Sequence, residues 1–202
     1  MQLDNRILTK AESLFFKYGI KSISMDDLSR ELGISKKTLY QSVENKKELV
    51  MQVFQNHAQK ELEAVVNIRK EAADSIDEMI EVAKYVIPTL RQITPTLIFD
   101  LQKYYRDVWQ MMETYNQQEV FKVIKENIER GIEEGIYREE FHPEIIAKLY
   151  VGKTMILIDE DIFPLRKYNK ENLFKEHIQY HIRGIATSKG LKLLEKHFKK
   201  LS

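Results

Sequence analysis

Residues 35–47 concentrate side chains that could bind a polyanion, because four lysines stand there against one acid, Glu44. The outward positions of Ser35–Gln41 carry ammonium, hydroxyl or amide groups: Lys36, Lys37, Thr38, Tyr40 and Gln41. Such groups contact phosphates and base edges in the major groove of DNA. A solvated helix face would hold the same residue types, so the elements around this stretch must decide between the two interpretations.

Three helix-start patterns surround the stretch. Each places a capping side chain before a predicted helix, in the pairs Ser24–Asp27 and Asn45–Glu48 and at Ser35. A capped helix start still presents free backbone N–H groups, which suit phosphate oxygens. We therefore expect three helix N-termini close together in the sequence, all suited to an anionic partner.

The turn between the first two of these helices has the residues that a helix-turn-helix needs. Ser29 is small where the helices would cross, and Gly33 tolerates the positive φ of a tight turn. The predicted buried positions of the two helices are Met25, Leu28, Leu32, Ile34 and Leu39. This spacing, with the clustered caps, favours DNA binding over a solvated face.

Two further lysines, Lys46 and Lys47, stand at the start of the third helix. A cation is unfavourable there, because the helix dipole places partial positive charge at the N-terminus. An anionic partner at that end would compensate for the cost.

Apolar residues recur at helical spacing along almost the whole chain, which predicts an all-α fold. In the first segment the predicted buried face is Ile7, Leu8, Ala11, Leu14, Phe15 and Tyr18, with Gly19 ending the helix. Pro88 should kink or end a later helix, whereas Thr94-Pro95 should begin one. His142-Pro143-Glu144 and Tyr168-Asn169-Lys170 are further predicted helix starts.

The helical segments are short before residue 47 and long after residue 67, which predicts three parts. We expect a helix-turn-helix domain at 1–47, a connecting helix at 48–67, and a ligand-binding and dimerisation domain at 68–202.

Composition limits the functional classes. The 202 residues carry 32 Lys plus Arg against 31 Asp plus Glu, and no cysteine, which excludes a disulfide scaffold or a thiolate zinc site. No apolar run could span a bilayer and the N-terminus lacks a signal peptide's apolar core, so we expect a cytoplasmic protein without a membrane partner. We find no phosphate loop, metal-ligand set or matched nucleophile and expect neither an enzyme nor a cofactor.

The N-terminal quarter resembles the DNA-binding domain of the tetracycline-repressor (TetR) family of bacterial regulators. The matching stretches are Ile7 through Phe15, Gly19, Ser24–Leu28, Leu32–Ser35, Thr38–Tyr40 and Lys46–Leu49, with Ile128–Gly135 and His142–Glu144 further along. The resemblance implies an N-terminal three-helix helix-turn-helix domain followed by a C-terminal helical bundle. It also implies a homodimer that binds double-stranded operator DNA.

Carried over by position, the resemblance implies a recognition helix holding Ser35, Lys37, Thr38 and Tyr40, with Lys46 on a phosphate. Residue chemistry adds Lys36 and Gln41, and we include Ser24 and Ser42 among the DNA contacts, Ser42 as a donor to a phosphate. The family often has His or Tyr at the place of Ser42 and usually an aromatic at that of Val43, so this chain departs from the pattern at both. The predicted helix contains no arginine, the commonest reader of guanine, so we expect readout to depend on Gln41 and the lysines.

Aromatic and methionine side chains gather in the middle of the chain. They are Phe99, Tyr104, Tyr105, Trp109, Met112, Tyr115 and Phe121, and Met155 is a later candidate. Ordinary core packing would explain them, but they could also line a cavity for a small hydrophobic effector. By family analogy the effector would release a repressor from its operator. The alternative is an architectural or protein-recruiting factor of the same fold that has no effector.

Two late helices, near 144–159 and 170–186, carry broad apolar faces that predict a dimer interface.

His177 and His181 share a helix face at a metal-ligand spacing, although a helix–helix interface is the favoured interpretation. The acidic run 159–161 is expected in a solvated loop. In the basic tail after Arg183, which includes Lys199 and Lys200, we expect Leu191, Leu194 and Phe198 to pack on the bundle.

Overall fold

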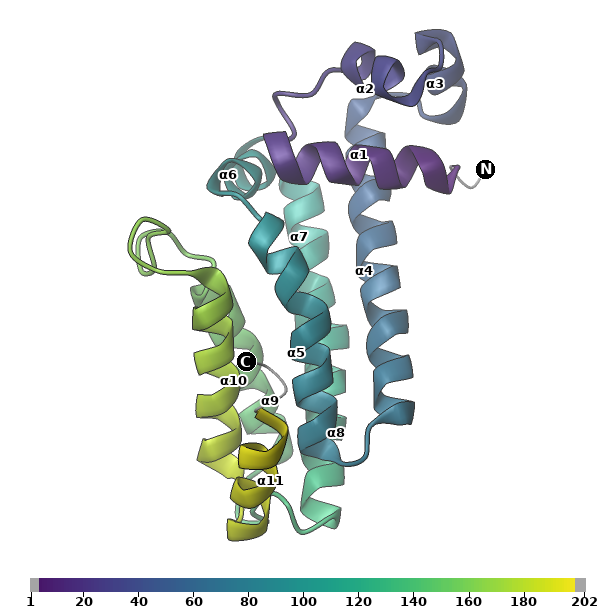
Figure 1. The fold of residues 1–202 in the computed structure, drawn as a ribbon. Helices are drawn as coiled ribbons and strands as arrows, with labels where there is room; N and C mark the ends of the chain where they lie inside the picture. Colours follow the sequence, from purple (N-terminus) through teal and green to yellow (C-terminus); the bar gives the residue numbers. More distant parts are fainter. Residues whose placement is uncertain (1–3, 199–202) are drawn as a thin grey trace. The chain divides into compact units, whose positions relative to one another are not determined.

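The structure is a computed structural model that describes residues 4–198. Its elements are α1 (Asn5–Tyr18), α2 (Met25–Leu32), α3 (Lys36–Ser42), α4 (Lys46–Glu71), α5 (Ser75–Gln92), α6 (Pro95–Tyr104), α7 (Arg106–Tyr115), the π-helical turn η1 (Asn116–Val120), α8 (Phe121–Glu133), α9 (Pro143–Ile156), α10 (Lys170–Ile185) and α11 (Ser188–Phe198) (Figure 1). Among the described residues, β pairing is limited to an isolated bridge between Tyr137 and Ala186. The prediction of an all-α fold is confirmed.

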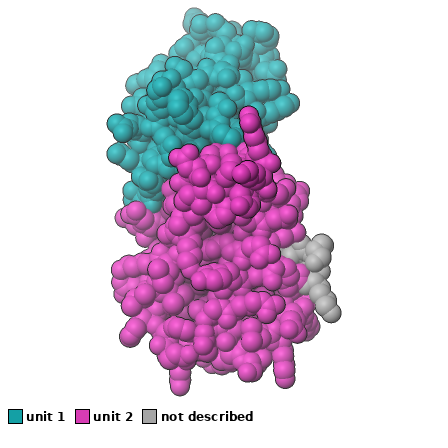
Figure 2. Space-filling model, turned by 90° about the vertical axis from the view of Figure 1, so that its left-hand side faces the viewer, with its two compact units in different colours: residues 1–62, 92–114 teal, residues 63–91, 115–202 magenta. Residues whose placement is uncertain are grey.

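The chain forms two compact units that are not consecutive in sequence. Unit 1 comprises residues 1–62 and 92–114, and unit 2 comprises residues 63–91 and 115–202 (Figure 2). The segment 92–114, with α6 and most of α7, therefore belongs to the N-terminal unit. The predicted parts 1–47, 48–67 and 68–202 were defined by the roles expected of them, namely DNA binding, connection, and ligand binding with dimerisation. That division stays a prediction.

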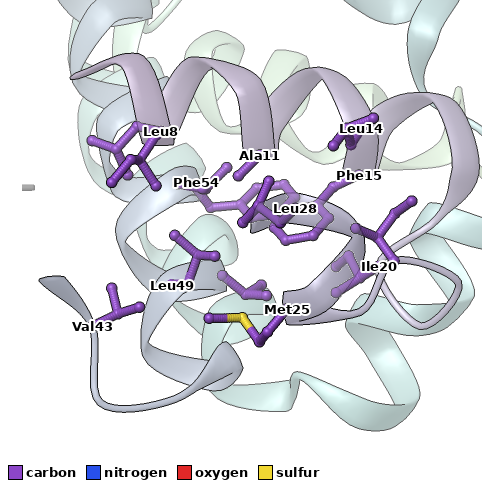
Figure 3. Packing of buried hydrophobic residues seen from close by; sticks show 14 of the residues in the cluster. Leu8, Ala11, Leu14, Phe15, Ile20, Met25, Leu28, Val43, Leu49 and Phe54 are labelled. Atoms are coloured by element: carbon purple, nitrogen blue, oxygen red, sulfur yellow. The ribbon is translucent and has the colours of Figure 1, made fainter. Parts of the chain in front are cut away.

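The core of unit 1 is built from apolar sides of α1, α2 and α4. Figure 3 shows Phe15 of α1, Leu28 of α2 and Phe54 of α4 pointing toward one another, each about 1% exposed. Leu97 and Leu101 of α6 belong to the same cluster. Val43, where the family usually has an aromatic, is 3% exposed and also lies in this core.

The buried side of α1 differs from the prediction at one position. Tyr18 is 48% exposed, with the Lys17 ammonium 4.8 Å from its ring centre. Phe16 is buried instead and stacks on Phe54 at 5.8 Å between ring centres. The helix ends at Tyr18, so no further helical turn covers that side chain.

Prolines begin helices as predicted but do not end one. Pro95 and Pro143 occupy the first turns of α6 and α9, and Asn169 caps α10. Pro88 lies inside α5, which continues to Gln92, so it does not end that helix. A proline removes one N–H from the helix ladder, and the flanking hydrogen bonds together with burial of the helix compensate.

A buried carboxylate organises unit 2. Glu78 of α5 is 1% exposed and accepts hydrogen bonds from Arg69 of α4 at 3.0 Å and from Arg130 of α8 at 3.4 Å. Arg130 also pairs with Glu134 at 2.7 Å, and Glu134 accepts from the backbone N–H of Ser75 at 2.9 Å. Three helices are thereby joined through one charge, which would be costly to bury unpaired.

The predicted turn at Ile128–Gly135 closes α8 beside this network. Gly131 lies against the Tyr137 ring, because a Cβ added there would come within 2.1 Å of a ring carbon. The α11 helix then packs as expected: Leu194 is 1% exposed, and Leu191 and Phe198 pack against the unit 2 core. Lys199 and Lys200 lie outside the described residues.

His177 and His181 of α10 lie at a helix–helix interface, as the favoured interpretation predicted. Their rings pack on Tyr150 of α9, at 4.7 and 4.8 Å between ring centres. Neither Nε2 atom has a hydrogen-bond partner among the described residues. Burial lowers the pKa of His177 to about 4 and that of His181 to about 3, and the charge of Lys153 contributes to both shifts.

Acid should therefore destabilise unit 2. Both folded-state pKa values lie below that of an unfolded histidine, so the neutral pair stabilises the fold above about pH 6.5, and this contribution disappears as the pH falls. We expect each histidine to lower the free energy of unfolding by about 1 to 2 kcal/mol between pH 7 and pH 5. The measurement is urea unfolding at both pH values, followed by circular dichroism.

The His181→Leu variant should lose its share of this pH dependence, because leucine does not titrate. The exposed His142→Gln variant is the control and should keep the wild-type difference. An undiminished pH dependence in His181→Leu would contradict the assignment.

Candidate nucleic-acid interface

The helix-turn-helix forms from local caps. Ser24 Oγ accepts from the backbone N–H of Asp27 at 3.1 Å, and the Asp27 carboxylate accepts from the backbone N–H of Ser24 at 3.0 Å. Gly33 adopts a left-handed conformation with φ of 66°, which ends α2 and turns the chain. Ser35 then caps α3 by accepting from the backbone N–H of Thr38 at 3.0 Å. The predicted capping box and turn are confirmed.

Two hydrogen bonds between side chains and the backbone cap the start of α4. Asn45 Oδ1 accepts from the backbone N–H of Glu48 at 3.0 Å, and Glu48 accepts from the backbone N–H of Glu44 at 2.6 Å. The third predicted helix start is therefore confirmed, with Glu44 rather than Asn45 as the donor to Glu48.

Leu39, with none of its surface exposed, anchors α3 to the core, and the rest of the helix turns outward. Of the predicted DNA contacts, the exposed ones are Ser24, Ser35, Lys36, Lys37, Thr38, Tyr40 and Gln41, and the half-buried ones are Ser42 and Lys46. The outward side of α3 thus brings together ammonium, hydroxyl and amide groups, which can contact phosphates and base edges.

Several of these groups already have partners within unit 1. The hydroxyls of Ser35 and Thr38 lie 2.8 Å apart, within hydrogen-bond distance. Lys36 pairs with Asp26 of α2 at 2.8 Å, which raises the pKa of Lys36. Lys37 forms no ion pair with any described residue. Of the two α3 lysines, Lys37 is therefore the one without an acidic partner among the described residues.

Lys46, a predicted phosphate contact, turns inward. Its ammonium donates to the backbone carbonyl of Ile20 at 2.5 Å. Burial lowers the pKa of Lys46 and the nearby Lys21 lowers it further, whereas the charges of Asp100 and Asp27 raise it. To reach DNA, this side chain would have to exchange the carbonyl for a phosphate.

Two carboxylates of segment 92–114 were missed from the sequence. Asp100 of α6 is 3% exposed and accepts from the backbone N–H of Lys21 at 2.8 Å. Asp107 of α7 pairs with Lys47 at 3.3 Å. For the pair of Lys47 with Asp107, the sequence offered one indication: two lysines stand at a helix start, where a cation is unfavourable. This predicted a nearby anion but did not identify it.

The eight candidate effector residues are divided between the units. Tyr105, Trp109 and Met112 pack in the unit 1 core. Phe99 and Tyr104 are about half exposed and contact each other edge to face at 6.1 Å. The remaining three, Tyr115, Phe121 and Met155, belong to unit 2.

The unit 2 candidates lie around the π-helical turn η1, which continues directly into α8 and packs against α9. Asn116, the first residue of η1, was not singled out from the sequence. Its side-chain amide donates to the Met155 sulfur at 3.8 Å. Such π-helical turns occur frequently at functional sites.

Neither a metal site nor a membrane span is found in the described part of the chain. Between residues 4 and 198, no group of three or more His, Asp or Glu side chains could hold a metal ion. No helix in that range is both long and apolar enough to cross a bilayer.

Comparisons with known proteins agree with this geometry. Residues 7–53 match the family model for bacterial regulatory proteins of the tetR family. The uncharacterized HTH-type transcriptional regulator YvaF of Bacillus subtilis is 24% identical over 165 residues, which cover 81% of this chain and 85% of YvaF.

Solved structures share the fold over most of the chain. Bacillus subtilis FadR in complex with stearoyl-CoA has a TM-score of 0.66 and 16% identity, covering 89% of this chain and 98% of FadR. A transcriptional regulator from Saccharomonospora viridis in complex with choline has a TM-score of 0.66 and 17% identity, covering 90% of this chain and 96% of that one.

The tetR family consists of DNA-binding regulators rather than enzymes. The matched helix-turn-helix assigns residues 7–53 to the DNA-binding domain of the tetR family of bacterial regulatory proteins, and most of the chain shares its fold with solved transcriptional regulators.

Proposed function

We propose that this regulator is a cytoplasmic repressor that binds operator DNA as a homodimer and is released by a small hydrophobic effector. The observation that carries the proposal is the outward side of α3, a capped and core-anchored helix that presents Lys37, Tyr40 and Gln41 within the matched DNA-binding domain. Gln41 would read adenine edges, and Lys37 would contact guanine or phosphate. Ser24, Ser35, Thr38 and Ser42 would add hydroxyl contacts to the backbone.

The effector would bind beside η1 in unit 2. Tyr115, Phe121 and Met155 would supply apolar contacts, and Asn116 would supply a polar one. Support comes from the π-helical turn and from two proteins of the same fold that bind stearoyl-CoA and choline. An effector site with these residues would combine apolar contacts with few polar groups, which suits a small hydrophobic ligand.

Dimerisation would use the exposed side of α9 with α10. Ile145, Leu149 and Ile156 are 56%, 52% and 42% exposed and recur at helical spacing, and Tyr180 of α10 is 66% exposed. The opposite side of the same helices is buried, through Tyr150, Phe174 and Ile178 among others. A helix pair that is apolar on both sides needs a second partner, and an operator with two-fold symmetry suits an identical one.

Replacing Lys37 by alanine should weaken operator binding and flatten its salt dependence. Removal of one ammonium–phosphate pair in each protomer should reduce the slope of log K against log salt by about 0.9 per protomer. The measurement is fluorescence anisotropy on a duplex selected from random sequences, over a salt series. The exposed Lys192→Ala variant on α11 is the control, and an unchanged slope in Lys37→Ala would contradict the assignment of Lys37 to DNA.

A thermal-shift screen with fatty acids, their coenzyme A esters and choline should find a ligand that also weakens operator binding. Met155→Ala and Asn116→Ala should reduce that response by about tenfold or more, equivalent to about 1.4 kcal/mol in binding free energy. Operator affinity without ligand should not change. The exposed Gln118→Ala in the same turn is the matched control. Ligands that stabilise the protein without weakening DNA binding would favour a factor that has no effector.

The Leu149→Glu variant should be monomeric at micromolar concentration in sedimentation velocity, because two charges would meet across the two-fold interface. The residue is 52% exposed, so the protomer should stay folded. Lys192→Glu, an exposed charge change on α11, should leave the dimer intact. A wild-type monomer, or a Leu149→Glu dimer, would refute this interface.

A further inference from the structure

The first turn of α4 holds two lysines in different states. Lys46 is half-buried and donates to a backbone carbonyl inside unit 1. Lys47 is exposed over 63% of its side chain and pairs with Asp107, which is 43% exposed. Only the second lysine has a partner that solvent reaches easily, so its ion pair is the one that can exchange.

The pair Lys47–Asp107 satisfies a local electrostatic need. Near the start of a helix a lysine adds to the positive end of the dipole, so an anion close to its ammonium is favourable. Asp107 supplies that anion from α7, sixty positions away in the sequence. An exposed pair of this kind is weak, because water and salt screen both charges.

A DNA phosphate would offer the same ammonium a stronger partner. The duplex carries a dense line of negative charge, and binding a cation releases condensed counterions. The carboxylate of Asp107 would repel the same backbone. Lys47 lies within residues 7–53, the part matched to the family's DNA-binding domain, and α4 begins four residues after α3 ends.

We propose that Lys47 binds a DNA backbone phosphate in exchange for Asp107, so that α7 limits how strongly α4 attracts DNA. The exchange breaks the 3.3 Å ion pair and forms an equivalent pair with phosphate, without change of protonation. This proposal rests on the DNA binding proposed above, and it does not require an effector. Asp107 thus acts as an internal competitor for one phosphate in each protomer.

The test is a double-mutant cycle on the full chain, using Asp107→Asn, Lys47→Gln and the combination. Binding to a random-sequence duplex of 20 base pairs is followed by fluorescence anisotropy over a salt series. We expect Asp107→Asn to tighten binding about three- to tenfold at low salt, which is about 0.7 to 1.4 kcal/mol. Lys47→Gln should weaken binding and reduce the salt slope by about 0.9 in each protomer.

The double variant distinguishes exchange of the Lys47 partner from a general effect of removing one negative charge. In the Lys47→Gln background the tightening caused by Asp107→Asn should disappear, because there is no lysine left to free. Glu113→Gln, the same charge change further along α7, is the matched control and should tighten binding less than twofold. Both paired side chains are substantially exposed, so the variants should melt close to the wild type.

Three outcomes would overturn the exchange: an unchanged salt slope in Lys47→Gln, tighter binding from Asp107→Asn that persists without Lys47, or an equal effect from Glu113→Gln. Failure of the wild type to bind any duplex would instead refute the proposed function. Lys37→Ala tells these cases apart, because it should weaken binding whether or not Lys47 exchanges its partner.

Discussion

The helices that would read DNA are too short to be stable alone, and the architecture of unit 1 follows from that constraint. The α2 helix has eight residues and α3 has seven, below the length at which isolated helices persist in water. Each is therefore stabilised by a side-chain cap at its start and by leucines in a core built on α1 and α4. Because those anchors face inward, the outer side of α3 is free to carry groups chosen for binding rather than for folding.

The same constraint explains why segment 92–114 belongs to unit 1. Leu97 and Leu101 of α6 enlarge the small core, and Asp100 fixes the chain between α1 and α2 through the backbone of Lys21. A buried carboxylate needs such partners. The segment therefore adds apolar area and also brings negative charge close to a domain that must bind a polyanion.

The features predicted correctly from the sequence are those decided by neighbouring residues. The pair Ser24–Asp27, the cap at Ser35, the turn at Gly33 and the prolines that begin α6 and α9 all act within one helical turn. What was missed depends on residues far apart in the chain. Neither the pairing of Lys47 with Asp107 nor the inward turn of Lys46 follows from local spacing, and the exposure of Tyr18 depended on where α1 ends.

Burial gives chemically similar ion pairs different roles in the two units. In unit 2, Glu78 is shielded from water and held by two arginines, so breaking that network would leave a charge unpaired in the interior. Such a network suits a fixed junction of helices. In unit 1, the pairs Lys36–Asp26 and Lys47–Asp107 are open to solvent, so each can be exchanged for a better anion at little cost. On the proposed function, a chain with almost no net charge can still bind DNA, because Lys37 has no ion-pair partner among the described residues and Lys36 and Lys47 have partners that solvent reaches.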